Sequence, residues 1–113
     1  MEKIMIPQAF KEKCEKIITK AASRTASCRW IPVGDAFIMG IHVKMASDLA
    51  QVFGQNIGLA ELKDMVKYAL KGWLSSSMVL SIIYQSPTER HAHMTEYIGW
   101  ELATRFYLKY YFR

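Results

Sequence analysis

The segment from Pro32 to Gly54 constrains the fold of this chain more than any other stretch, because it has a marked start, a marked end and apolar residues in between. Proline is poorly tolerated inside a helix and pushes the preceding Ile31 toward an extended conformation. Asp35 then stands where an N-cap belongs, since its carboxylate can accept hydrogen bonds from free backbone N–H groups. Gly54 suits the left-handed residue that closes a helix. The sequence therefore predicts a helix between Asp35 and Gly54.

Apolar residues cover much of the surface of this predicted helix. One stripe at three- and four-residue spacing is formed by Ile38, Ile41, Met45, Leu49 and Val52, and it is widened by Phe37, Ala46, Ala50 and Phe53. A helix with so wide an apolar surface normally packs on several sides, so we expect it at the centre of the fold. His42, Lys44 and Asp48 lie on the same helix. We interpret these three as scaffold rather than as a catalytic site, and we expect His42 to be a satisfied buried side chain.

Two further amphipathic helices are predicted from the spacing of apolar residues. Residues 8–28 carry one apolar face at helical spacing, made of Phe10, Cys14, Ile17, Ile18, Ala21 and Thr25. Gly58 and Glu61 open another helix, which Gly72 is expected to end or kink. The segment "WLSSSMVLSIIYQ" that follows is ambiguous, because its β-branched cluster also suits a strand. A lone strand would have no partner, so we predict a buried helix of about ten residues there.

The sequence "SPTE" at 86–89 marks the start of the last helix. Ser86 caps, Pro87 takes the first helical position and Glu89 reaches back, which together make a capping box. The helix is expected to run from Pro87 to near Phe112. It carries one apolar stripe of Met94, Ile98, Leu102 and Phe106, and a second of Trp100, Ala103, Tyr107 and Tyr111. Two stripes imply that the helix packs on two sides within its own domain, or that one stripe packs on the domain and the other on a second molecule or surface.

Size and composition fit one folded domain. The 113 residues are 51% hydrophobic and 22% charged, which is the reverse of the balance that keeps chains disordered. We predict an all-α fold, a compact bundle of four to five helices over residues 1–113. Cys14 and Cys28 would be roughly 21 Å apart on one helix, so we expect reduced, buried thiols. No signal peptide or apolar stretch of about 20 residues is visible, which predicts a cytoplasmic protein, either free or peripheral at the inner face of the membrane.

Motifs for catalysis are missing from the sequence. It contains no G-x-S-x-G, no phosphate-binding glycine loop and no Cys-x-x-Cys. His91 and His93 are two residues apart, so on a helix they point in different directions and cannot share a metal ion. We therefore expect no enzyme activity, no metal and no cofactor.

Two surfaces are candidates for binding. Lys13, Lys16, Lys20 and Arg24 form a basic face on the first predicted helix, which is either a solvated surface or a site for an anionic membrane or an acidic partner. The chain end "RFYLKYYFR" mixes aromatic and basic side chains. The candidate partner-binding residues there are Trp100, Arg105, Tyr107, Lys109, Tyr111 and Arg113. Packing alone, a protein interface and a membrane interface all suit this pattern, whereas nucleic-acid binding is the least favoured. The net charge of +5 is spread without a basic tract.

The segment "IPVGDAFIMGIHVKMASDLAQVFG" resembles the I-P-x-x-D start, the mid-helix methionine and the L-A-x-x-[YF]-G ending of the YcjF-like helical domain. That domain has unknown function and follows the G domain in many Era-like bacterial GTPases. The matching residues are Ile31, Pro32, Asp35, Met45, Leu49, Ala50, Phe53 and Gly54. The closing "TEYIGWELATRFYLKYYF" is similar to the final helix of that domain, with Gly99 at its small-residue position. The resemblance implies a bacterial all-α accessory domain that binds a protein or a membrane surface. The segment between the two motifs is more polar here than in that family, and the 113 residues contain no G domain, so the resemblance does not imply GTP hydrolysis by them.

These features together predict a non-enzymatic protein-interaction module. It would act as a small adaptor, an inhibitor or a GTPase-type accessory domain, with another protein or a second copy of itself, as a homodimer, as its partner. The alternative is a peripheral membrane-associated protein that binds anionic lipid surfaces through its basic face and its C-terminal aromatic residues.

Overall fold

The computed structural model describes residues 6–28, 36–75 and 87–111, and all regular secondary structure within these ranges is helical. The helices are α1 (Gln8–Ala26), α2 (Ala36–Val52), α3 (Leu59–Leu74) and α5 (Pro87–Tyr110). The prediction of an all-α bundle is therefore confirmed for the described part of the chain. The predicted caps Asp35 and Ser86, and most of the helix predicted after Trp73, lie outside the described residues.

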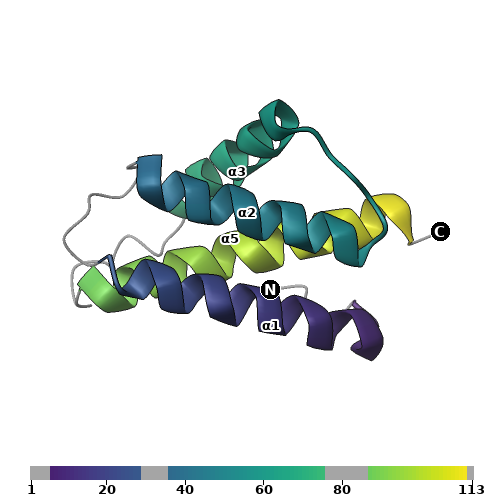
Figure 1. Cartoon of the computed structure of the whole chain (residues 1–113), viewed down its shortest axis with the longest axis horizontal. Coiled ribbons are helices and arrows are strands. Elements are labelled where there is room, and N and C mark those ends of the chain that lie inside the picture. Colours follow the sequence, from purple (N-terminus) through teal and green to yellow (C-terminus); the bar gives the residue numbers. More distant parts are fainter. Residues whose placement is uncertain (1–5, 29–35, 76–86, 112–113) are drawn as a thin grey trace.

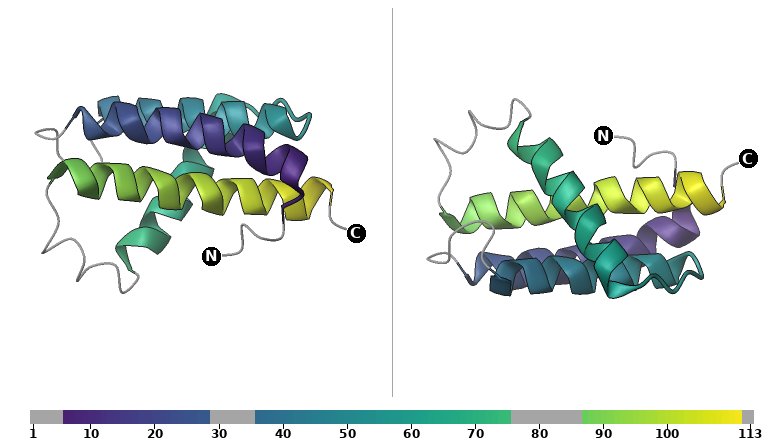
Figure 2. Two further views of the ribbon diagram at one scale, coloured as in Figure 1. Left: turned by 90° about the horizontal axis from the view of Figure 1, so that it is seen from below. Right: turned by 90° about the horizontal axis from the view of Figure 1, so that it is seen from above.

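Three of the helices run side by side along the long axis of the molecule, and the fourth crosses them (Figures 1 and 2). α1 runs antiparallel to α2 and α5, while α3 crosses α2 and α5 obliquely (Figure 1). Both α2 and α5 contact all the other described helices. The expectation that the Pro32–Gly54 helix alone is the centre is therefore not confirmed, because α5 occupies an equally central place.

Two of the predicted helix boundaries, at Gly54 and Gly58, are confirmed. Gly54 has φ +74°, and the N–H of Gln55 donates to the carbonyl of Ala50 (2.9 Å), which is the bond that closes a helix on a left-handed glycine. α3 starts after Gly58 as expected but continues through Gly72 to Leu74, so of the two alternatives predicted for Gly72, an end or a kink, the end is wrong. Continuing the helix buries the Trp73 side chain, which is 2% exposed, and such burial outweighs the roughly 1 kcal/mol that glycine costs in a helix.

The core joins the predicted apolar stripes. Met94, Ile98, Leu102 and Phe106 of α5 are all fully buried, against Ile18 of α1, Ile38, Met45 and Leu49 of α2, and Val66 of α3. α1 and α5 approach closely at Gly99, where an added Cβ would lie 2.6 Å from Ile18 Cγ1. Only glycine allows this separation of the two helices, since the Ile18 side chain is itself buried.

The second stripe of the last helix closes one end of the bundle. A ring of α1 meets rings from just beyond the ends of α2 and α5: Tyr111 lies 4.9 Å from Phe10 and 5.7 Å from Phe53, measured between ring centroids. Phe53 also contacts the rings of Phe106 and Tyr107, each at 6.4 Å. Aromatic pairs at such distances stabilise a core beyond their buried area, so this part of the stripe packs inside the chain's own fold.

Candidate interaction surface

His42 is a structural residue in this fold. Its side chain is 1% exposed, and its Nε2 lies 2.9 Å from Thr95 Oγ1. Burial, and secondly the charge of His91, lower the pKa of His42 from 6.5 to about 4. The imidazole is therefore neutral at neutral pH, and the sequence-based expectation of a satisfied buried histidine is confirmed.

Thr95 is the centre of a buried polar junction between α1, α2 and α5. Its Oγ1 lies 2.7 Å from Thr25 Oγ1 and 2.9 Å from the carbonyl oxygen of His91, besides its contact with His42. Thr25 Oγ1 has further acceptors in the carbonyl oxygens of Ala22 (3.1 Å) and His91 (3.3 Å). The hydroxyls thus have their partners within the junction, and nothing in its geometry points to a ligand.

The two cysteine thiols are shielded from solvent as well. Cys14 and Cys28 are free and buried, as expected, and burial raises the pKa of the Cys14 thiol to about 11. A thiol with so high a pKa holds almost no thiolate at neutral pH and is a poor nucleophile. Within the described residues, no three His, Cys, Asp or Glu side chains cluster closely enough to hold a metal ion.

The predicted binding residues of the last helix do not form one surface. Trp100 is only 8% exposed, Tyr107 is partly buried beside Phe53, and Tyr111 packs on Phe10 and Phe53 although 44% of it is exposed. Arg113 lies outside the described residues.

Arg105 and Lys109 lie on a different part of α5. They line a shallow surface with Glu101, Thr104 and Leu108. The Arg105 guanidinium sits 4.9 Å from the centroid of the exposed Tyr68 ring of α3, and Lys109 Nζ lies 5.4 Å from that of Tyr110. The two cations thus contact aromatic rings of the chain itself.

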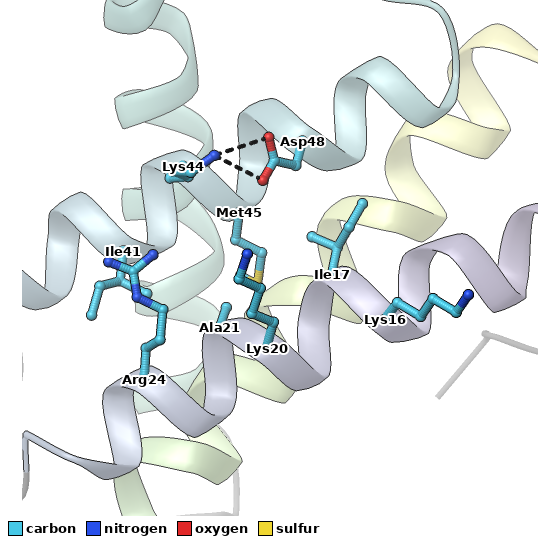
Figure 3. A pocket seen from close by; sticks show the side chains of 9 residues that line it. All are labelled: Lys16, Ile17, Lys20, Ala21, Arg24, Ile41, Lys44, Met45 and Asp48. Carbon is cyan, nitrogen blue, oxygen red and sulfur yellow. Dashed lines mark hydrogen bonds and ion pairs between the residues drawn. The ribbon is translucent and has the colours of Figure 1, made fainter.

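The basic face of α1 instead borders a groove against α2 (Figure 3). Its lining combines cations with an apolar floor and consists of Lys16, Ile17, Lys20, Ala21, Arg24, Ile41, Lys44, Met45 and Asp48. Because the helices are antiparallel, Arg24 stands near Ile41 at one end, and Ile17 stands near Asp48 at the other (Figure 3). Lys13 is exposed on α1 but does not line the groove.

Charge in this basic groove is unbalanced. Lys44 Nζ pairs with Asp48, 3.2 Å from Oδ2 and 3.4 Å from Oδ1. Within the described ranges, no carboxylate forms an ion pair with Lys16, Lys20 or Arg24. All three are exposed, so three cations of α1 point their charge at solvent beside an apolar floor.

The volume of the basic groove is about 200 Å³. Pockets for small ligands usually hold about 300–1,000 Å³, whereas a cavity of about 150 Å³ holds one benzene ring. The groove therefore suits one or two apolar side chains of a larger partner better than a cofactor.

The sequence analysis did not predict that residues of α2 form one side of this groove. Lys44 and Asp48 were interpreted as scaffold, and Ile41 and Met45 as core, which they also are, being 5% and 1% exposed. The lysine spacing on α1 indicated a basic face, but no signal in the sequence shows which turn of α2 lies beside it.

Comparison of the chain with protein-family models, with characterised proteins and with solved structures finds no match. The resemblance to the YcjF-like helical domain stays a prediction. None of the described helices combines the length and the apolarity that a membrane crossing requires.

Proposed function

We propose that this chain is a non-enzymatic protein-interaction module that holds an acidic segment of a partner protein in the basic groove between α1 and α2. One observation carries the proposal: Lys16, Lys20 and Arg24 border an apolar floor without a carboxylate partner among the described residues. An acidic partner would supply the missing countercharge, and its apolar side chains would cover the floor.

The burial of His42 and Cys14 supports binding rather than catalysis at these two groups. His42 is neutral and hydrogen-bonded inside the bundle, and the Cys14 thiol is buried with a raised pKa. A catalytic acid, base or nucleophile must reach its substrate. The groove itself is lined by lysines, an arginine and apolar side chains, with one carboxylate that is already paired.

The recessed floor favours a protein over a membrane as the partner. A lipid surface attracts exposed lysines from a distance and needs no groove between them. The basic groove instead places Ala21 and Met45, 6% and 1% exposed, below the cationic rim. A polypeptide can insert side chains there. The adaptor, inhibitor and accessory-domain roles predicted from the sequence all need such a protein contact.

The test compares two matched double variants in a pull-down from a lysate of the source cells. Lys20→Glu/Arg24→Glu reverses two groove cations, and Lys67→Glu/Lys71→Glu reverses two exposed cations of α3 at the same four-residue spacing. In each pair the second residue lies in the last turn of its helix. Each replacement lowers the formal charge by two, so both variants fall from +5 to +1.

The proposal expects the groove variant to lose a captured protein, identified by mass spectrometry, that the α3 variant retains. Capture should also weaken as salt is raised, because exposed charges are screened. Equal capture by both variants would contradict the assignment of the groove. If the protein captures no partner but sediments with phosphatidylserine vesicles in a Lys20- and Arg24-dependent way, the membrane alternative replaces the proposal.

A further inference from the structure

We infer that the segment held in the basic groove is an amphipathic α-helix with acidic residues four positions apart, lying along α1 and α2. The inference rests on the proposed function and specifies the conformation and the charge pattern of the ligand. It draws on the spacing of the cations, the nature of the floor and the position of Asp48.

The spacing of the cations along α1 sets the spacing of the carboxylates that we expect in the ligand. Lys16, Lys20 and Arg24 are four residues apart, which corresponds to a rise of about 6 Å between neighbours. A helix with carboxylates at i, i+4 and i+8 repeats the same rise along its own axis. Laid beside α1 in either direction, it places one carboxylate opposite each cation.

The floor of the groove favours a helix over an extended peptide. Ile17, Ala21, Ile41 and Met45 offer apolar atoms, and the backbone groups of α1 and α2 are used within their own helices. An extended peptide would place its N–H and C=O groups against this surface without partners, and unpaired buried backbone groups are costly. A helix satisfies those groups itself and presents an apolar stripe, which is how helix-in-groove complexes form.

Asp48 makes the two ends of the groove unequal in charge. Its carboxylate stands at the Ile17 end, where it holds Lys44 in an ion pair (Figure 3). The Arg24 end has no acidic side chain in its lining. A ligand carboxylate is therefore attracted more strongly at the Arg24 end than opposite Lys16, which lies at the Asp48 end (Figure 3), so the carboxylates opposite Arg24 and Lys20 should contribute most to binding.

The probe for the test is a synthetic fluorescein-labelled peptide of about 18 residues, roughly 27 Å long as a helix. It carries a leucine and alanine stripe at helical spacing and glutamates at i, i+4 and i+8. A second peptide has the same composition in an order that breaks both periodicities. Fluorescence anisotropy measures both against the full chain at low salt, and circular dichroism of the unlabelled designed peptide follows its helicity on binding.

The expected result has three parts. The designed peptide binds at least about tenfold more tightly than the scrambled one and gains helicity. Lys20→Glu/Arg24→Glu weakens its binding by about tenfold or more, whereas Lys67→Glu/Lys71→Glu changes it by less than about twofold. Asp48→Asn strengthens binding about two- to fivefold, because one exposed repulsive charge is removed and Lys44 becomes free.

Other outcomes overturn the inference, and they separate it from the proposed function. Equal binding of both peptides, with the groove variant still weakened, leaves an acidic ligand but removes the requirement for a helix. Equal weakening by both double variants, or no binding of either peptide at low salt, removes the groove as a peptide site. Weaker binding after Asp48→Asn contradicts the predicted charge order alone.

Discussion

Helix α1 meets its two neighbours in contrasting ways. Against α5 it is in close contact, since Gly99 leaves space for Ile18 and the Thr25 and Thr95 hydroxyls lie 2.7 Å apart. Against α2 it leaves the basic groove, whose rim is charged and whose apolar floor is recessed, with Ile17 partly exposed and Ala21, Ile41 and Met45 buried. The Thr25 and Thr95 hydroxyls at the α1–α5 contact have hydrogen-bond partners within the fold. In the groove, by contrast, no carboxylate of the described chain pairs with Lys20 or Arg24.

The difference separates stability from binding along one helix. Substitutions on the α5 side should lower the free energy of unfolding, because they disturb a closely packed and hydrogen-bonded interior. Substitutions on the rim of the groove should barely change that free energy, yet they should change the affinity for an acidic partner. Each prediction below tests one side of this contrast.

The largest loss of stability is expected for Gly99→Val. The new side chain would begin 2.6 Å from Ile18 Cγ1, so α1 and α5 must separate, and we expect a loss of about 3 kcal/mol. Gly40→Val is the matched control, because no atom lies within 4 Å of a Cβ added at Gly40, and it should change stability by less than about 0.5 kcal/mol. Urea unfolding measures both, and similar values for the two variants would contradict the close contact.

Acid should weaken the polar junction through His42. Its folded pKa of about 4 lies below the ordinary 6.5, so between these values the unfolded state binds more protons and stability rises with pH. The contribution is complete above pH 6.5 and is lost as pH falls toward 4, amounting to about 3 kcal/mol. His42→Gln should remove this part of the pH dependence, as followed by urea midpoints. An unchanged pH profile in the variant would show that His42 does not carry it.

A smaller loss is expected when Thr95 becomes valine. Thr95→Val keeps the shape but removes the hydroxyl that contacts Thr25 and His42, leaving the His42 ring nitrogen without that partner. We expect a loss of about 2 kcal/mol. Thr19→Val, at an exposed position of α1, is the control and should stay within about 0.5 kcal/mol. A Thr95→Val protein as stable as the unaltered chain would mean that the junction contributes little.

The smallest change in stability is expected for the groove. Lys20→Glu/Arg24→Glu and Lys67→Glu/Lys71→Glu should each shift the free energy of unfolding by less than about 1 kcal/mol, since all four side chains are exposed. Thermal unfolding of both double variants and of the unaltered chain measures these shifts. A much larger loss in the groove variant would mean that these cations stabilise the fold itself, and its binding data would then need correction.

Local signals in the sequence predicted the helices well. Gly54 closes α2 and Gly58 opens α3, because such positions depend on the backbone geometry of a few neighbouring residues. Gly72 predicted an end or a kink, but α3 continues to Leu74, because the burial of Trp73 is a tertiary effect that local signals do not reveal. Periodicity also identified both apolar stripes of the last helix, but it could not show that Tyr111 packs on Phe10 of α1 and on Phe53, which follows α2.

The candidate site lay beyond the sequence for a related reason. The basic face of α1 was visible from the spacing of Lys16, Lys20 and Arg24, and the apolar character of Ile41 and Met45 was visible too. The groove forms only where these two sets meet across helices, and that register is decided by packing of the whole bundle rather than by either segment.

The most direct test of the account is an amide chemical-shift titration of the full chain with the acidic helical peptide. The account predicts that the largest shifts cluster in residues 16–24 of α1 and 41–48 of α2, the two segments that line the basic groove. Largest shifts on α3, or on residues 101–109 of α5, with the groove residues unmoved, would contradict it.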